Sequence, residues 1–184
     1  MPIPQELQFT RRDYQALPDT GPRHQLVEGD LIMAPAPNRY PQEICGNLEF
    51  ILCSYLKRYP IGKVYHAPFD VYLDELNVFQ PDILFVSKAN SSILTDIGAE
   101  GAPDLIVEIL SPSNSELDRE RKRKIYAHCG VVEMWIVSPE GRTVQIYRLQ
   151  EDATKPVAIR GEHETLESGL FPELAIDLRE VFAA

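Results

Sequence analysis

Cysteine is scarce in this sequence, and its spacing excludes a disulfide framework and a cysteine-rich zinc site. The three cysteines are odd in number and form no Cys-x-x-Cys pair (Cys45, Cys53 and Cys129). Small secreted folds use even sets of cysteines, and structural zinc sites use closely spaced pairs. We therefore expect a protein of a reducing compartment, the cytoplasm.

Long hydrophobic runs are also absent. No stretch approaches the roughly 20 apolar residues that a transmembrane helix requires, and the N-terminus lacks a basic start followed by an apolar run. We expect neither a membrane span nor a signal peptide. The 184 residues are 44% hydrophobic and 25% charged, which is ordinary for a globular protein. They suffice for one compact domain, residues 1–184, with a sizeable core.

Motifs for several common chemistries are missing as well. The chain has no Walker A loop, no Gly-x-Gly-x-x-Gly and no Gly-x-Ser-x-Gly. Nucleotide hydrolysis, dinucleotide binding and serine-hydrolase chemistry therefore have no support. Four histidines lack metal-ligand spacing and are expected at surface or packing positions (His24, His66, His128 and His163).

Positive charge is in deficit, since the net charge is −10. This disfavours a protein that wraps nucleic acid without sequence preference, because phosphate binding normally needs a positive surface. One basic cluster remains, "DRERKRK" at 118–124. Its members either contact phosphate or, as in most charge runs, form a solvated helix face (Arg119, Arg121, Arg123 and Lys124).

Apolar periodicity and capping residues predict three helices. Thr10 is a candidate N-cap, Pro41 suits a first helical position, and Ser113 or Ser115 opens a capping box. Gly130 suits a helix C-cap. The expected helices cover about 10–17, 41–59 and 113–128.

Short apolar runs between turn residues predict the strands. They are expected as a pair within 24–35 turning at 28–30, several between 62 and 87, one at 104–110, a hairpin over 131–149 turning at 139–141, and one near 156–160. Residues 90–102 are expected to form a loop with one helical turn. This order predicts an α/β fold with a mixed central sheet flanked by helices.

One predicted strand has a carboxylate at its centre. In "PDLIVEILSPSN", Glu108 lies between aliphatic residues on both sides. Glutamate is almost never fully buried unless it is paired or binds a cation. Either the strand turns Glu108 to solvent, or the charge has a function. Asp104 shares its face but lies about 13 Å away along an extended strand, so we expect it to be structural.

A second acid, Asp82, opens the preceding strand directly after a proline. Pro-Asp is common at turns, so this dipeptide alone is weak evidence of function. Two carboxylates on neighbouring strands can, however, hold one hard cation such as Mg²⁺, which prefers oxygen ligands and keeps several waters.

The third candidate is Lys122 in the last long helix. Helical residues step about 100° around the axis, so Asp118, Tyr126, Ile125 and Cys129 lie within roughly 60° of Lys122. Lys122 is therefore expected beside the apolar face of the helix that points toward the core. The alternative is a surface ion pair with Asp118. An inward lysine near two carboxylates can orient a metal-bound water and offset developing negative charge, which suits phosphodiester hydrolysis.

These residues lie within a longer resemblance. The segments "QPDILFV", "APDLIVEILSPSN" and "DRERKRKIYAHCGVVEMWIVSPEGRTVQIYR" resemble the Uma-two family of restriction endonucleases, within the PD-(D/E)XK nuclease superfamily. "LVEGDLIMAPAPN" and "HETLESGLFPELAIDLREVF" resemble its N-terminal hairpin and closing segment, so nearly the whole chain is covered. The resemblance implies a restriction-endonuclease-like core.

Residue by residue, the resemblance implies an Mg²⁺ or Mn²⁺ site. Asp82, Glu108 and the backbone carbonyl of Ile109 match its ligands. The usual superfamily lysine, two residues after the second acid, is Leu110 here, and Lys122 matches the helix position to which this family has moved it. Glu108 and Leu110 face the same way, so a helix packed on that face could supply the missing ammonium group.

Some accessory positions differ from the family. His24-Gln25 stands where Tyr-Glu is usual, so the carboxylate there is lost or replaced by Glu28. Other departures are Pro41 in place of a histidine, and Met134 and Ser138 in the strand "EMWIVSP". The accessory candidates are therefore Gln25, Glu28, Asp118 and Tyr126. Four aromatic residues are expected in the core (Tyr126, Trp135, Tyr147 and Phe182).

Taken together, the sequence predicts a Mg²⁺-dependent endonuclease that hydrolyses DNA, as a homodimer like many superfamily members. Two alternatives remain. The first is a nuclease-fold protein that binds nucleic acid or a protein partner without cleaving. The second is a structural module in which Lys122 pairs with Asp118 and Glu108 meets an arginine.

Overall fold

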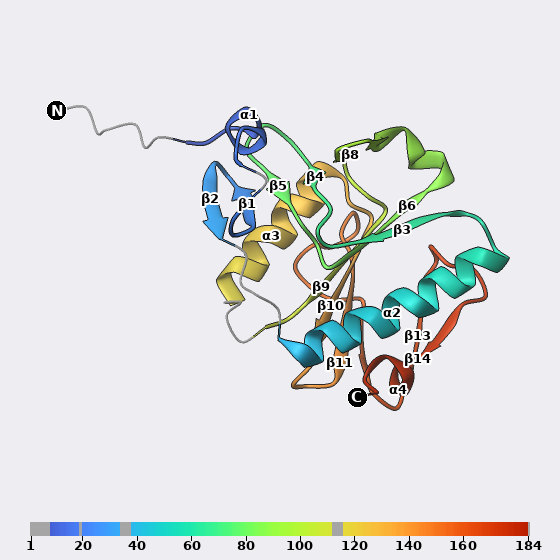
Figure 1. The fold of residues 1–184 in the computed structure, drawn as a ribbon. Coiled ribbons are helices and arrows are strands. Elements are labelled where there is room, and N and C mark those ends of the chain that lie inside the picture. Colours follow the sequence, from blue (N-terminus) through green and yellow to red (C-terminus); the bar gives the residue numbers. More distant parts are fainter. Residues whose placement is uncertain (1–7, 19, 34–37, 112–115, 184) are drawn as a thin grey trace.

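The computed structural model describes residues 8–18, 20–33, 38–111 and 116–183. Figure 1 shows the arrangement of its elements. The helices are α1 (Arg11–Gln15), α2 (Arg39–Arg58), η1, a 3-10 helix (Lys88–Ile93), α3 (Glu116–Cys129) and α4 (Leu178–Val181). The strands are β1 (His24–Val27), β2 (Asp30–Met33), β3 (Gly62–His66), β4 (Val71–Tyr72), β5 (Val78–Phe79), β6 (Ile83–Ser87), β7 (Leu94–Thr95), β8 (Gly98–Glu100), β9 (Leu105–Ile109), β10 (Glu133–Ser138), β11 (Thr143–Arg148), β12 (Ala158–Gly161), β13 (Thr165–Glu167) and β14 (Ala175–Asp177).

The central sheet has six strands in the order β12-β11-β10-β9-β6-β3. Strands β9 and β10 are parallel, and the other neighbours are antiparallel. The middle strands β6, β9 and β10 are buried on both faces. This explains their nearly continuous apolar sequences, which is the pattern of strands covered on both sides.

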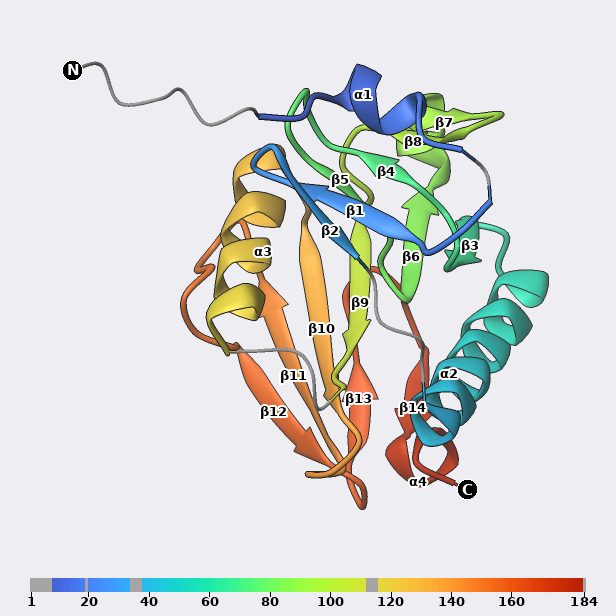
Figure 2. The ribbon, with the colours of Figure 1, turned by 60° about the vertical axis from the view of Figure 1, so that its left-hand side comes forward.

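The two faces of this sheet pack against different helices. On one face, Phe85, Val107 and Trp135 join the cluster formed by α2, α4 and the β13–β14 hairpin. On the other, Ile106 and Met134 join the cluster that contains α3. Figure 2 shows α2 and α3 on opposite sides of the central strands. Alternate residues of each strand point to opposite faces, so even-numbered residues of β9 face α3.

A second six-stranded sheet, in the order β2-β1-β5-β4-β8-β7, contributes to the α3 side. The β1–β2 hairpin turns at Glu28 and Gly29, both with positive φ (51° and 85°), as expected for this turn. The prediction of a mixed α/β fold with flanking helices is confirmed. The second sheet was not predicted, because most of its strands have only two or three residues and show no clear periodicity.

Other boundaries differ in similar ways. The expected loop at 90–102 contains the end of η1 and the strands β7 and β8, and the two short strands β13 and β14 were not predicted. Helix α2 begins at Arg39, so Pro41 is its third residue. Gly130, with φ 102°, follows the end of α3 as expected. The proposed caps Ser113 and Ser115 lie outside the described residues.

No helix within the described ranges is long and apolar enough to cross a membrane.

Candidate active site

Asp82 and Glu108 lie on neighbouring antiparallel strands. The register pairs Ile83 with Val107 and Leu84 with Ile106, and its extension by one residue places Asp82 opposite Glu108. Directly opposed side chains have Cβ atoms about 4.5–5.5 Å apart. A hydrogen bond also joins the two segments: the backbone N–H of Ile109, next to Glu108, donates to Asp82 Oδ2 at 2.6 Å. The structure thus brings together the two carboxylates that the sequence singled out.

Helix α3 contributes two side chains that contact the carboxylate of Glu108. Lys122 Nζ lies 3.5 Å from Glu108 Oε1, and the Tyr126 hydroxyl donates a 2.8 Å hydrogen bond to that same oxygen. Residues four apart share a helix face, so both donors come from one stripe of α3. Both contacts are made to the same oxygen, Oε1 of Glu108.

The position two residues after Glu108 is apolar. Leu110 packs against the cluster on the α3 side of the sheet, the face that Glu108 also shares. The ammonium group near Glu108 therefore comes from the helix rather than from the strand. This is the arrangement that the sequence resemblance implied for Lys122.

Phe79, at the end of β5, covers the two α3 donors and was missed in the sequence. Its ring centroid lies 5.5 Å from Lys122 Nζ and 5.1 Å from the Tyr126 ring in an edge-to-face contact. The Lys122 and Glu108 side chains are only 19% and 12% exposed. The available sequence signal was the aromatic residue three positions before Asp82, but its contact with α3 depends on the tertiary fold.

Asp82 and Glu108 both interact with the ammonium group of Lys122. Burial and then the negative charge of Glu108 raise the pKa of Asp82, the Ile109 N–H and Lys122 oppose the rise, and the resulting pKa is about 7. Two like charges this close disfavour joint ionisation. The pair therefore has a deficit of positive charge at neutral pH.

Tyr126 is fully buried, and its surroundings keep its phenol protonated. Burial and then the charge of Glu108 raise the pKa of Tyr126 well above its ordinary value. It therefore stays protonated at neutral pH and acts as a hydrogen-bond donor to Glu108.

The donor set fits a divalent cation of the Mg²⁺ type. Two opposed carboxylates with too little positive charge, next to the backbone of Ile109, offer the oxygen ligands that such a cation prefers. Within the described ranges, no group of three or more His, Cys, Asp or Glu side chains is arranged to hold a metal. A cation here would therefore take backbone and water oxygens for its remaining positions, as Mg²⁺ commonly does.

Of the four accessory candidates, Tyr126 is the donor to Glu108 described above, and the other three are Gln25, Glu28 and Asp118. Gln25 Oε1 accepts a 3.5 Å hydrogen bond from the Gln80 N–H, two residues before Asp82. Glu28 forms an ion pair with Arg121, so its carboxylate holds the β1–β2 turn on α3. Asp118 lies exposed on α3.

Two of the four α3 residues considered for a solvated face, Arg121 and Arg123, instead have partners within the protein. Arg121 also binds Asp30 at 3.1 Å, and Arg123 donates to the Ala153 carbonyl at 2.6 Å and lies over the Tyr147 ring. These intramolecular contacts were not visible in the sequence because they join distant segments. Lys124 does form a surface pair, with Glu120 at 2.8 Å.

Asp104 has the structural role that was expected. Its carboxylate accepts hydrogen bonds from the Ser87 backbone N–H at 2.8 Å and from the side chain of Asn90 at 3.2 Å. The four aromatic residues predicted in the core are all buried (Tyr126, Trp135, Tyr147 and Phe182).

Replacing Tyr126 with phenylalanine is expected to destabilise the protein by about 1–2 kcal/mol, because the buried carboxylate of Glu108 loses a donor. Urea denaturation measures this change in the free energy of unfolding. Tyr147→Phe is the matched control, since its hydroxyl donates to the neutral amide of Gln145 at 2.9 Å. Tyr126→Phe should cost more than this control; an equal or smaller cost would show that the contact with Glu108 does not stabilise the fold.

Comparisons with known proteins identify the family and support the fold. A profile of the Uma2 family, described as "Putative restriction endonuclease", matches residues 11–179. A crystal structure of a "putative nuclease belonging to DUF820" from Anabaena variabilis has a TM-score of 0.80, with 20% sequence identity, and covers 95% of this chain and 98% of that chain. At this identity the likeness shows the fold. No curated protein matches. The resemblance seen in the sequence is confirmed, and because the profile spans most of its length, this chain belongs to the Uma2 family.

Proposed function

We propose that this protein is a Mg²⁺-dependent endonuclease that hydrolyses phosphodiester bonds of DNA, with Mn²⁺ able to replace Mg²⁺. Its membership of a nuclease family supports hydrolysis of nucleic acid. The observation on which the proposal rests is the opposition of Asp82 and Glu108 on neighbouring strands, with Lys122 reaching Glu108 from α3.

In this proposal Asp82, Glu108 and the Ile109 carbonyl would hold the cation. When bound, it supplies a Lewis acid that lowers the pKa of a water and stabilises charge on the phosphate. Glu108 stays oriented because Tyr126 fixes its Oε1. Lys122, beside the same oxygen, donates hydrogen bonds to the attacking water or to a non-bridging phosphate oxygen. The α3 helix thus takes over the role of the strand position occupied by Leu110.

The test is nicking of supercoiled plasmid with Mg²⁺ or Mn²⁺, for wild type and Lys122→Ala. The variant is expected to lose roughly 10²-fold in rate, the usual contribution of a positioned proton donor or acceptor. Lys124→Ala is the control, because Lys124 lies on the same helix but is exposed and paired with Glu120. The control should nick like wild type.

Equal nicking by wild type and Lys122→Ala would remove Lys122 from the mechanism. Metal binding by wild type without any nicking would instead favour a nuclease-fold protein that binds nucleic acid or a partner without cleaving. The net charge of −10 and the Gln25 amide in place of a family carboxylate favour this second candidate.

The proposal also covers the domain organisation, the oligomeric state and the cellular compartment of the enzyme. We propose that residues 1–184 act as one nuclease domain and that two copies form a homodimer, since cleavage of both DNA strands needs two sites. Three free, half-buried cysteines support a reducing compartment such as the cytoplasm.

A further inference from the structure

Phe79, the last residue of β5, lies between the second sheet and the candidate active site. Its backbone pairs with Val71 of β4 in the second sheet. Its side chain is fully buried, in the cluster on the α3 side of the central sheet. The ring therefore joins the second sheet to the helix that carries Lys122, and the mechanism proposed above gives it no role.

The ring of Phe79 is a second contact for the ammonium group of Lys122. Nζ lies over the ring, 5.5 Å from its centroid, which is within the roughly 6 Å range of a cation–π interaction. The contact of Nζ with Glu108 Oε1 measures 3.5 Å, which is long for a hydrogen bond. Lysine carries its charge on a flexible four-carbon stem, so one long contact fixes the ammonium group poorly. The ring supplies the further constraint.

Water competes little for this contact. The Lys122 side chain is mostly buried, and the Phe79 side chain is completely buried. Cation–π attraction is stronger where the cation is desolvated than at exposed sites. We therefore expect the ring to influence where the ammonium group lies.

The same ring also contacts the other side chain that binds Glu108. The rings of Phe79 and Tyr126 meet edge to face, with centroids 5.1 Å apart and an interplanar angle of 81°. This is a preferred geometry for aromatic pairs. Because the Tyr126 hydroxyl donates to Glu108 Oε1, Phe79 packs against both α3 side chains that contact this carboxylate.

We propose that Phe79 is a positioning residue of the active site, whose ring holds the Lys122 ammonium group beside Glu108 through a cation–π contact. The ammonium group is then in place before the substrate binds. The consequence for catalysis rests on the proposed nuclease function, whereas the contact itself does not. If Phe79 only filled the core, its shape and volume would matter but the electron density of its ring would not.

Fluorination at position 79 alone separates these two roles. 3,4,5-Trifluorophenylalanine closely keeps the shape of the ring, but fluorine withdraws its electron density and weakens its attraction for a cation. In plasmid nicking with Mg²⁺, we expect kcat to fall about tenfold with KM unchanged, and 4-fluorophenylalanine to give an intermediate rate. Lys122→Met keeps the apolar stem and removes the cation, so in that background fluorination should leave the residual rate unchanged.

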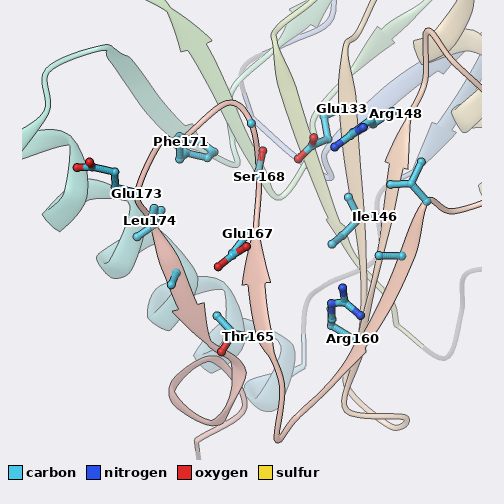
Figure 3. A pocket seen from close by; sticks show the side chains of 14 residues that line it. Glu133, Ile146, Arg148, Arg160, Thr165, Glu167, Ser168, Phe171, Glu173 and Leu174 are labelled. Atoms are coloured by element: carbon cyan, nitrogen blue, oxygen red, sulfur yellow. The ribbon is translucent and has the colours of Figure 1, made fainter.

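Phe171 is the matched control for fluorination. It is buried and packs against other aromatic rings, including that of Phe85 at 4.7 Å, and no cation–π contact within the described ranges involves it. It lies on the face of the central sheet opposite α3, where it lines a cleft of about 680 Å³ (Figure 3). Trifluorophenylalanine at position 171 should leave the nicking rate unchanged.

Urea denaturation of the same proteins tests the contact independently of activity. Trifluorophenylalanine at position 79 should lower the free energy of unfolding more in the wild-type background than in the Lys122→Met background. If the protein nicks no DNA, this difference supports the contact, and only the proposed function fails. Equal losses in the two backgrounds would overturn the inference. So would nicking that depends on Lys122 but does not respond to fluorine at position 79.

Discussion

Glu108→Gln is expected to abolish metal-dependent nicking of supercoiled DNA, with a loss on the order of 10³-fold or more, because it removes a charged metal ligand. Glutamine is chosen because it has nearly the same shape as glutamate. The amide keeps an oxygen to accept from Tyr126, and it keeps the volume of a side chain that is only 12% exposed. The charge is lost while the packing stays, so the fold is expected to remain intact.

The same substitution has a second consequence at Asp82. The charge of Glu108 is the second largest cause of the raised pKa of Asp82, so Glu108→Gln should lower that pKa. Asp82 would then be ionised at neutral pH, yet nicking would still be lost because one carboxylate cannot replace two. Circular dichroism and the melting temperature check the fold in parallel with the nicking assay.

Glu120→Gln is the matched control for Glu108→Gln. Glu120 lies on α3 near the site in sequence, but its carboxylate is 46% exposed and pairs with Lys124. It should nick like wild type. Nicking by Glu108→Gln at the control rate would show that Glu108 holds no catalytic cation, and the proposed mechanism would fail.

The sequence predicted the carboxylate pair and the lysine for separate reasons. An acid inside an apolar strand is conspicuous because burial of an unpaired charge is costly, and the helical spacing placed Lys122 on the inward stripe of α3. These are local signals, and the structure brings all three residues together. The fold class was likewise predicted from the long apolar strands and from the helices with capping residues.

Contacts between segments that are distant along the chain could not be predicted from the sequence. Phe79 covers Lys122 and Tyr126 from a strand of two residues, too short for any periodicity. Glu28 was expected near the metal ligands but pairs with Arg121, because the β1–β2 turn packs on α3.

Asp82→Asn is expected to stabilise the metal-free protein at pH 8. The pKa of Asp82 is about 7 in the fold, against an ordinary value of 3.8. Between these pH values the folded state holds a proton that the unfolded state has released, so the free energy of unfolding falls as pH rises from about 4 to about 7. With about 1.4 kcal/mol for each pKa unit, the full penalty above pH 7 is ~4 kcal/mol at most. Asparagine removes it and can still accept from the Ile109 N–H.

Urea denaturation at pH 5 and pH 8, with a chelator and with Mg²⁺, measures this effect. At pH 8 with chelator, Asp82→Asn should exceed wild type by about 2–4 kcal/mol, and at pH 5 the difference should be much smaller. Mg²⁺ should stabilise wild type, increasingly as pH rises through 7, and leave the variant unchanged. Asp96→Asn, in the exposed β7–β8 turn, alters the net charge equally and should show neither effect. If Asp82→Asn were less stable than wild type at pH 8 without metal, or if Mg²⁺ stabilised both alike, the two carboxylates would not form a cation site.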